Sequence, residues 1–273
     1  MLSHPNIALM KTITRAYNGI RDFVDGFSNS STSHKKAPVS KKNREAWYAE
    51  WDDNYLSGIL NSKVVNTAFK KIADSFYGEQ LNDILKDATM LTDTSFPNMY
   101  DVYADCCTTL GMYNPPKAYV TCKIMGINAL SVEVCDKQLI LISPQVAIGL
   151  SEKEQKFLLG HEISHHQQGN LVCHTVNGLA DEYKRKSEIV APLVLDAIEV
   201  PLKRWCRCSE LNADRGGYLC CKDINAVRTL FNRVGNLEGS TTLAKYLETE
   251  ASYPLLETRF QTLSEYSNRI KTA

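Results

Sequence analysis

Three of the six histidines of the chain lie within the short stretch 160-GHEISHHQQGN-170. His161 and His165 are four residues apart, so on a helix they face the same way and can hold one metal ion through neutral imidazole nitrogens. Glu162 follows the first histidine and would lie beside the metal, where a general base must sit to take a proton from a zinc-activated water molecule. The alternative for so short a pattern is a solvated helix face.

The helix that would carry these residues has well-marked ends. Ser151 and Glu154 form the pattern of a capping box, in which each side chain satisfies a backbone N–H group of the first helical turn. Gly169 and Asn170 are typical of a helix C-terminus. We therefore predict one helix over residues 152–168.

A catalytic zinc site usually has three protein ligands and one open position, so a third ligand must come from another element. The segment 204–221 contains Glu210 and Asp214, which are four residues apart and hence lie on one face of a helix. Glu210 can reach the zinc, and Asp214 can accept the free N–H of a zinc-bound histidine and fix its tautomer. In the alternative, both acids form exposed ion pairs with Arg207 and Arg215. Small residues on the same segment would allow a close approach to the first helix: Ala213, Gly216 and Gly217.

These two segments together resemble a known family. HEISH at 161–165, followed by RCSELNADR at 207–215, is similar to the HExxH and RxxExxAD pair of the HtpX-like and CAAX-prenyl-protease-like zinc peptidases. Those enzymes are gluzincins, in which two histidines and one glutamate bind zinc. The lead-in 138–166 resembles their strand, loop and active-site helix, and the resemblance extends over residues 115–270. Many members carry transmembrane helices between the two motifs, whereas this chain looks like a soluble branch.

The resemblance implies a zinc-dependent endopeptidase that acts on a peptide or protein substrate. His161, His165 and Glu210 would bind one catalytic Zn²⁺, Glu162 would be the general base, and Asp214 would support a ligand. The rival reading is a zinc-binding interaction protein that keeps the peptidase fold but is catalytically silent or latent. The intact Glu162 argues against a silent site, because the fold alone has no need of that base.

The resemblance also points to residues that would hold the substrate. Asn128 and Ala129 resemble the asparagine–alanine element of an edge strand that pairs with an extended peptide. Near the C-terminus the family often has a His-Pro pair with a downstream arginine. Here Pro254 and Arg259 match, but Tyr253 replaces the histidine. Tyr253 is therefore a candidate catalytic donor to the oxyanion, and the alternative is an aromatic side chain that only packs.

Two further histidines need separate interpretations. His166 lies one residue beyond a proposed ligand, about 100° round the helix, and is predicted to face solvent or a neighbouring carboxylate. His174 lies beyond the helix stop and carries no assigned role, with a substrate-side donor as the alternative.

The surrounding patterns predict an α+β fold. Three segments rich in β-branched residues, 118–124, 129–134 and 138–143, predict strands joined mostly by hairpins. A helix is predicted from Asn98 to Leu110, and the pattern after Pro144 is helical. With the resemblance, this implies a mainly helical zincin-type metallopeptidase whose small mixed sheet packs on the active-site helix.

We divide the chain into three parts. Residues 1–44 form an amphipathic segment and a polar linker, residues 45–114 a helical N-terminal region, and residues 115–273 the zinc metallopeptidase domain. No motif decides whether the first two parts support the peptidase, select its substrate or cover its cleft.

Composition limits the class of partner and the compartment. The chain has 31 Lys plus Arg and 31 Asp plus Glu, so no basic excess indicates a nucleic-acid partner. Residues 189–202 contain acids and prolines and predict a buried helix rather than a membrane span, and no secretory signal is visible. We therefore predict a cytoplasmic protein.

The nine cysteines are predicted to be reduced and packed as small hydrophobic residues. The alternative is a second zinc ion held by four of them: Cys206, Cys208, Cys220 and Cys221.

Overall fold

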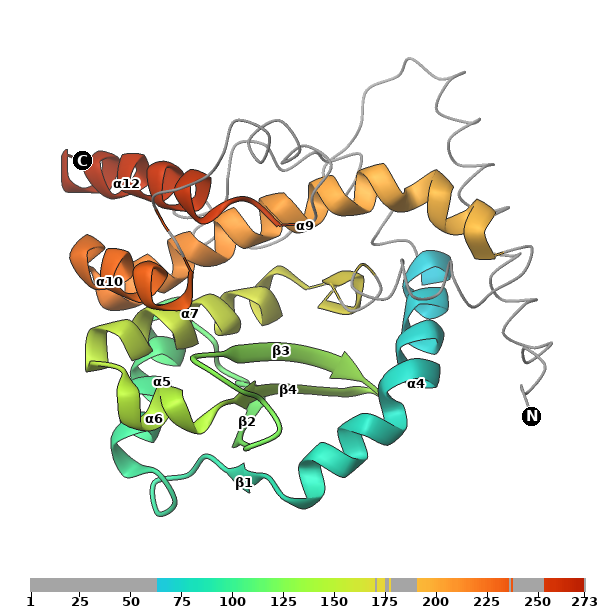
Figure 1. Cartoon of the computed structure of the whole chain (residues 1–273), viewed down its shortest axis with the longest axis horizontal. Coiled ribbons are helices and arrows are strands. Elements are labelled where there is room, and N and C mark those ends of the chain that lie inside the picture. The colour runs from blue at the N-terminus through green and yellow to red at the C-terminus, as the bar shows by residue number, and fades with distance from the viewer. Residues whose placement is uncertain are drawn as a thin grey trace.

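The computed structural model describes residues 63–169, 171–174, 177, 191–235, 237 and 253–272. Within these residues the fold is α+β, with helices packed around a small mixed sheet (Figure 1). The predicted fold class is therefore confirmed. The predicted N-terminal segment and linker, residues 1–44, lie outside the described residues.

The sheet has four strands in the order β1-β2-β4-β3. Their bounds are Thr89–Met90 for β1, Lys117–Val120 for β2, Ala129–Val134 for β3 and Lys137–Ile142 for β4. β3 and β4 form the expected antiparallel hairpin, and β3 is an edge strand.

The predicted hairpin between the first two of the three strands is wrong. β2 instead pairs in parallel with β4, with Ala118 opposite Ile140, so the chain leaves β2 and reaches β3 on the far side of β4. β4 takes the centre because its residues 139–142 are all buried, which suits a strand covered on both faces. β1, only two residues long and exposed, has too short a pattern to be read from the sequence.

The structure gives the bounds of seven helices in the described part of the chain, and residues 171–174 and 177 are also helical. Their bounds are Lys63–Lys86 for α4, Pro97–Leu110 for α5, Pro144–Gly149 for α6, Glu152–Gln168 for α7, Ala191–Cys221 for α9, Ile224–Val234 for α10 and Leu256–Thr272 for α12. α7 has the predicted limits, and both hydrogen bonds of its capping box are present. α9 joins the two segments expected at 189–202 and 204–221 into one helix of 31 residues that continues through Pro201.

α7 is the central helix of the structure. It lies between the sheet and α9, which crosses above it, as Figure 1 shows. Glycines allow this close approach: a Cβ on Gly216 would lie 1.9 Å from Ser164 Oγ, and one on Gly217 would lie 2.5 Å from the Phe157 carbonyl oxygen. The prediction that small residues let the two helices meet closely is confirmed.

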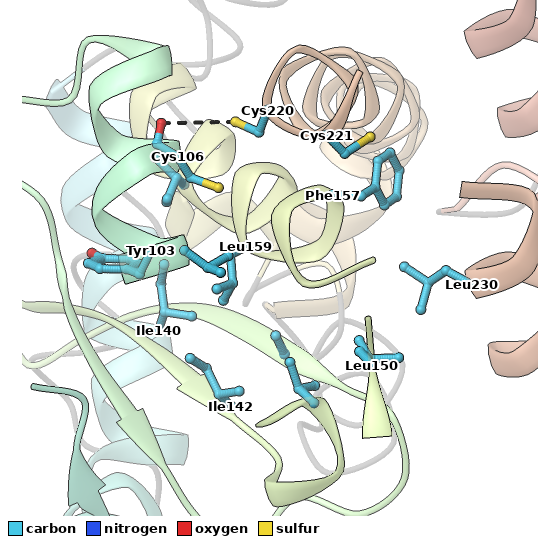
Figure 2. Packing of buried hydrophobic residues seen from close by; sticks show 14 of the residues in the cluster. Tyr103, Cys106, Ile140, Ile142, Leu150, Phe157, Leu159, Cys220, Cys221 and Leu230 are labelled. Atoms are coloured by element: carbon cyan, nitrogen blue, oxygen red, sulfur yellow. Dashed lines mark hydrogen bonds between the residues drawn. The ribbon is translucent and has the colours of Figure 1, made fainter. Parts of the chain in front are cut away.

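The hydrophobic core fills the space between α5, α7, α9 and β4 (Figure 2). Cys106 and Cys220 face one another there, beside Leu159 of α7 and above Ile140 of the sheet. None of the nine cysteines is in a disulfide, which agrees with the predicted reduced thiols. Burial raises the pKa of the Cys107 and Cys221 thiols to about 11, so they stay protonated at neutral pH.

The alternative of a second zinc on four cysteines is wrong. Cys206 and Cys220 lie on one continuous helix, and a rise of about 1.5 Å per residue puts them roughly 20 Å apart. They also belong to two different core clusters.

α4 packs against the C-terminal end of β3. Lys70 of α4 forms an ion pair of 2.8 Å with Glu133 of β3. Just beyond the strand, the Cys135 backbone N–H donates to Asp74 Oδ1 at 2.5 Å. The end of the edge strand is therefore tied to α4.

Candidate metal centre

The three predicted ligands come together where α7 and α9 meet. The Nε2 atoms of His161 and His165 are 3.1 Å apart. Glu210 places one carboxylate oxygen 3.5 Å from His161 Nε2 and the other 3.4 Å from His165 Nε2. All three side chains are buried, and among the described residues no other group of three or more His, Cys, Asp or Glu side chains converges in this way.

These distances fit a zinc ion. Bonds of about 2.1 Å in a tetrahedral site put neighbouring ligand atoms about 3.4 Å apart. Two imidazole nitrogens also cannot face each other at 3.1 Å with both lone pairs inward unless a positive charge lies between them. Burial acts to lower the pKa of His161, but hydrogen bonds to Asp214 and Glu210 outweigh it and raise the pKa to about 10, so the cluster attracts cations.

His161 is held from behind by a carboxylate. Its Nδ1 lies 3.0 Å from Asp214 Oδ1, which fits the ligand-supporting position predicted for that acid. Arg259 of α12 donates to both oxygens of Asp214, from Nε at 2.8 Å and from Nη2 at 2.6 Å. Although burial opposes it, the Arg259 guanidinium keeps the pKa of Asp214 below its usual value.

The alternative of exposed ion pairs for these acids is wrong. Glu210 and Asp214 are 5% and 1% exposed, and the guanidinium beside both of them is Arg259, which also approaches Glu210 to 3.5 Å. Sequence separation hid this pairing, because α12 follows α9 only after a long intervening segment.

His165 is held by neutral groups that the sequence did not indicate. Its Nδ1 lies 3.2 Å from Ser209 Oγ, and the same hydroxyl lies 2.9 Å from His174 Nε2. The His174 ring lies edge-to-face with the His165 ring, with centroids 4.7 Å apart, and it also packs against Trp205. Burial lowers the pKa of His174 to about 3, so its imidazole is neutral. Ser209 directly precedes a predicted ligand in the sequence, and that position is the signal that could have identified it.

Glu162 lies in the cleft beside this cluster and is not part of it. Its side chain is buried, and its backbone carbonyl accepts a hydrogen bond of 2.8 Å from Ser131 Oγ. That bond fixes β3 against α7 at the level of the metal centre. The edge strand and the predicted base therefore share one cavity.

The cleft has a volume of about 290 Å³. Asn128 and the first residue of β3, Ala129, form one wall, and α10 contributes an apolar wall through Leu230 and Phe231. The backbone of Asn128 is already used, because its carbonyl accepts from Ser143 N at 3.0 Å and its N–H donates to Ser143 Oγ at 3.2 Å. Antiparallel pairing alternates, so the backbone N–H and C=O of Ala129 face outward.

Tyr253 also lines the cleft, and its side chain is about half exposed. Partial burial, and after it the negative charge of Glu210, raises the pKa of Tyr253 above its usual value. The phenol therefore keeps its proton and is available as a donor.

The prediction that His166 faces solvent or a neighbouring carboxylate is wrong. Both of its ring nitrogens are buried, and burial lowers the pKa of His166 to about 4. The ring lines a second cavity of about 510 Å³, on the side of α7 that faces β2 and β4. The sheet covers a helix face that the sequence pattern left exposed.

In this site, two packed helices bring two histidines and a glutamate together beside an edge strand, and a second glutamate lies next to them. This arrangement is typical of metallopeptidases. The sequence profile of peptidase family M48 matches residues 95–267, and the chain belongs to that family. The match begins just before α5, a helix that the sequence-based division placed in the region 45–114.

No curated protein and no solved structure matches the chain significantly. In the described part of the chain, no helix is both long and apolar enough to cross a lipid bilayer.

Proposed function

We propose that the chain is a zinc-dependent endopeptidase that uses Glu162 as its general base. The observation that carries this proposal is the convergence of His161, His165 and Glu210, whose ligand atoms all lie within 4.8 Å of one another in the cleft that also holds Glu162. Membership of a metallopeptidase family supports it. Zinc in this site would polarise the scissile carbonyl and make an attacking water molecule more acidic.

Glu162 suits the part of a proton carrier. It follows a ligand on the same helix but does not belong to the ligand cluster, so its carboxylate is free to accept the proton of the attacking water. The same carboxyl group then passes that proton to the leaving amine. Its burial beside the cluster keeps bulk water away from the transfer.

The substrate we propose is an extended peptide that adds to the outer edge of β3. The backbone groups of Ala129 face outward and can bond to a peptide, whereas those of Asn128 bond to Ser143. Asn128 would then shape the start of the edge rather than bind the peptide backbone. The apolar wall at Leu230 and Phe231 gives room for a hydrophobic side chain of the substrate.

Tyr253 is our candidate for oxyanion stabilisation. Its phenol keeps a proton to donate, and it lies in the same cleft as Glu162 and Glu210. Tyr253→Phe removes that donor alone, so kcat should fall by about 10²-fold while zinc content and thermal stability are unchanged. A kcat equal to that of the wild type would exclude Tyr253 from the reaction.

The deciding experiment measures zinc content and cleavage of casein for the wild type and Glu162→Gln. The substitution keeps all three proposed ligands, so both proteins should bind one zinc ion, and cleavage should fall by about 10²–10⁴-fold. Glu152→Gln is the matched control, because Glu152 is an exposed glutamate in the first turn of the same helix. It should cleave at the wild-type rate.

Each other outcome has a definite meaning. If Glu162→Gln cleaves as fast as the wild type, Glu162 is not the base. If both proteins bind zinc and neither cleaves, the silent or latent zinc-binding protein replaces the peptidase. If the wild type binds no zinc, the ligand set is wrong.

A further inference from the structure

The starting point is the nitrogen of His165 that faces away from the metal site. An imidazole that binds an ion through Nε2 is neutral and carries its proton on Nδ1. In His165, Nε2 faces His161 and Glu210, and Nδ1 lies 3.2 Å from Ser209 Oγ. The Nδ1–H group therefore donates to the Ser209 hydroxyl oxygen.

Ser209 must then donate its own hydrogen elsewhere. A serine hydroxyl has one hydrogen and two acceptor lone pairs, and one lone pair already accepts from His165. Among the residues that the structure describes, the acceptor in contact with it is His174 Nε2, 2.9 Å from Ser209 Oγ. Ser209 is 2% exposed, so water has little access to replace this partner.

The proton of His174 is thereby placed on Nδ1. That atom lies 3.9 Å from Glu210 Oε1, too far for a hydrogen bond but close enough for the N–H dipole to favour the carboxylate. The contacts run from one proposed ligand, His165, through Ser209 and His174 to another, Glu210. Each proton in this path has one consistent position.

We propose that His174 is a positioning residue for the metal centre: it orients the Ser209 hydroxyl, which in turn fixes the tautomer and ring orientation of His165. This inference rests on the proposed function only in taking His165 as a metal ligand. Trp205 packs against His174, with ring centroids 5.1 Å apart, and restricts its rotation. His174 follows α7 in the chain while Ser209 belongs to α9, so the contact also joins these two segments.

The test uses two substitutions of His174 that differ in which nitrogen they imitate. The amide oxygen of a glutamine can take the place of Nε2 and accept from Ser209, whereas the shorter asparagine reaches only the place of Nδ1. We expect His174→Asn to weaken zinc binding by about 10–100-fold, the usual effect of losing a group that supports a ligand. His174→Gln should retain zinc affinity within a few-fold of the wild type. The readout is the zinc Kd of the full-length protein, measured by competition with a chromophoric chelator.

Ser209→Ala provides the second arm. If His174 acts through Ser209, the loss of zinc affinity in Ser209→Ala should match that in His174→Asn, and the double variant should be no weaker than Ser209→Ala alone. Ser264→Ala is the matched control, because Ser264 donates to a carbonyl of its own helix at 2.7 Å, and it should bind zinc as the wild type does. Circular dichroism of the metal-free proteins identifies any variant that fails to fold.

Several results would overturn the inference. If His174→Asn and His174→Gln have equal zinc affinities, His174 acts by packing or not at all. The same follows if the losses of zinc affinity in the two single variants add up in the double variant. In the zinc-loaded protein, ¹⁵N NMR should show His165 protonated at Nδ1 in the wild type and in His174→Gln. A wild type that binds no zinc would instead overturn the proposed function, and the two failures are therefore distinguishable.

Discussion

The two imidazoles of the metal centre must both be held in a fixed orientation, but different side chains hold them. Behind His161 stands a carboxylate, Asp214, which a guanidinium holds in place through two hydrogen bonds. Behind His165 stands a serine hydroxyl, which a neutral imidazole holds in place. Because the charges of Asp214 and Arg259 offset each other, neither support leaves an extra charge near the ion. The comparison shows that a histidine can be oriented by a buried ion pair or by neutral dipoles. The two supports should differ in how much stability is lost when one member is removed.

Asp214→Asn should have the largest effect. The substitution removes the charge that compensates the buried Arg259, so the free energy of unfolding should fall by about 3–5 kcal/mol. Ser209→Ala breaks only neutral hydrogen bonds and should cost about 1–3 kcal/mol. Urea denaturation of the metal-free proteins measures both. Equal losses in the two variants would contradict the distinction between a charged and a neutral support.

Gly217→Ala should affect both supports at once. The added Cβ would lie 2.5 Å from the Phe157 carbonyl oxygen, so α9 must move away from α7 at a cost of about 1–3 kcal/mol. Since α9 carries Ser209, Glu210 and Asp214, zinc affinity should fall along with stability. Gly149→Ala is the control, because the nearest atom to its Cβ would be 3.6 Å away, an ordinary contact. A Gly217→Ala protein with wild-type zinc affinity would show that the helix spacing does not set the site.

Glu154→Gln should have the smallest effect and leave both supports intact. Glu154 caps α7 and pairs with Arg233, which together lower its pKa although burial opposes this. A lowered pKa in the folded state gives stability that is fully present above the unfolded pKa of about 4.3 and is lost as pH falls through the lower pKa of the folded state. The variant should therefore be about 1 kcal/mol less stable than the wild type at pH 7, and this difference should shrink as the pH falls through the lowered pKa of the folded state. Unchanged zinc affinity at pH 7 would show that a loss of stability does not by itself weaken the metal centre.

The sequence predicts those parts of the structure that depend on local patterns. Ser151 and Glu154 mark the start of α7, and the spacing of His161 and His165 places both on one face. The glycines of α9 indicate a close contact with α7, because no larger residue fits there. Each of these features is set within one helix or by the size of one side chain.

The sequence does not predict features that arise between distant segments. The strand pattern of residues 118–124 identifies β2 but not its partner, because antiparallel and parallel neighbours need similar side chains. Ser209 and His174 are ordinary residues on two separate helical segments, and only the folded chain puts them 2.9 Å apart. The burial of His166 likewise depends on where the sheet lies.

The contact between α4 and β3 has a consequence for self-association. An edge strand offers unpaired backbone groups to any extended chain, including another copy of the same protein, and a long open edge invites aggregation. In the described part of the chain, the ion pair between Lys70 and Glu133 ties the far end of β3 to a helix and leaves the beginning, near Ala129, facing the cleft. Only a short stretch of backbone is then available for pairing. The strand can accept a peptide beside the metal centre, while its length gives little opportunity for sheet-to-sheet assembly.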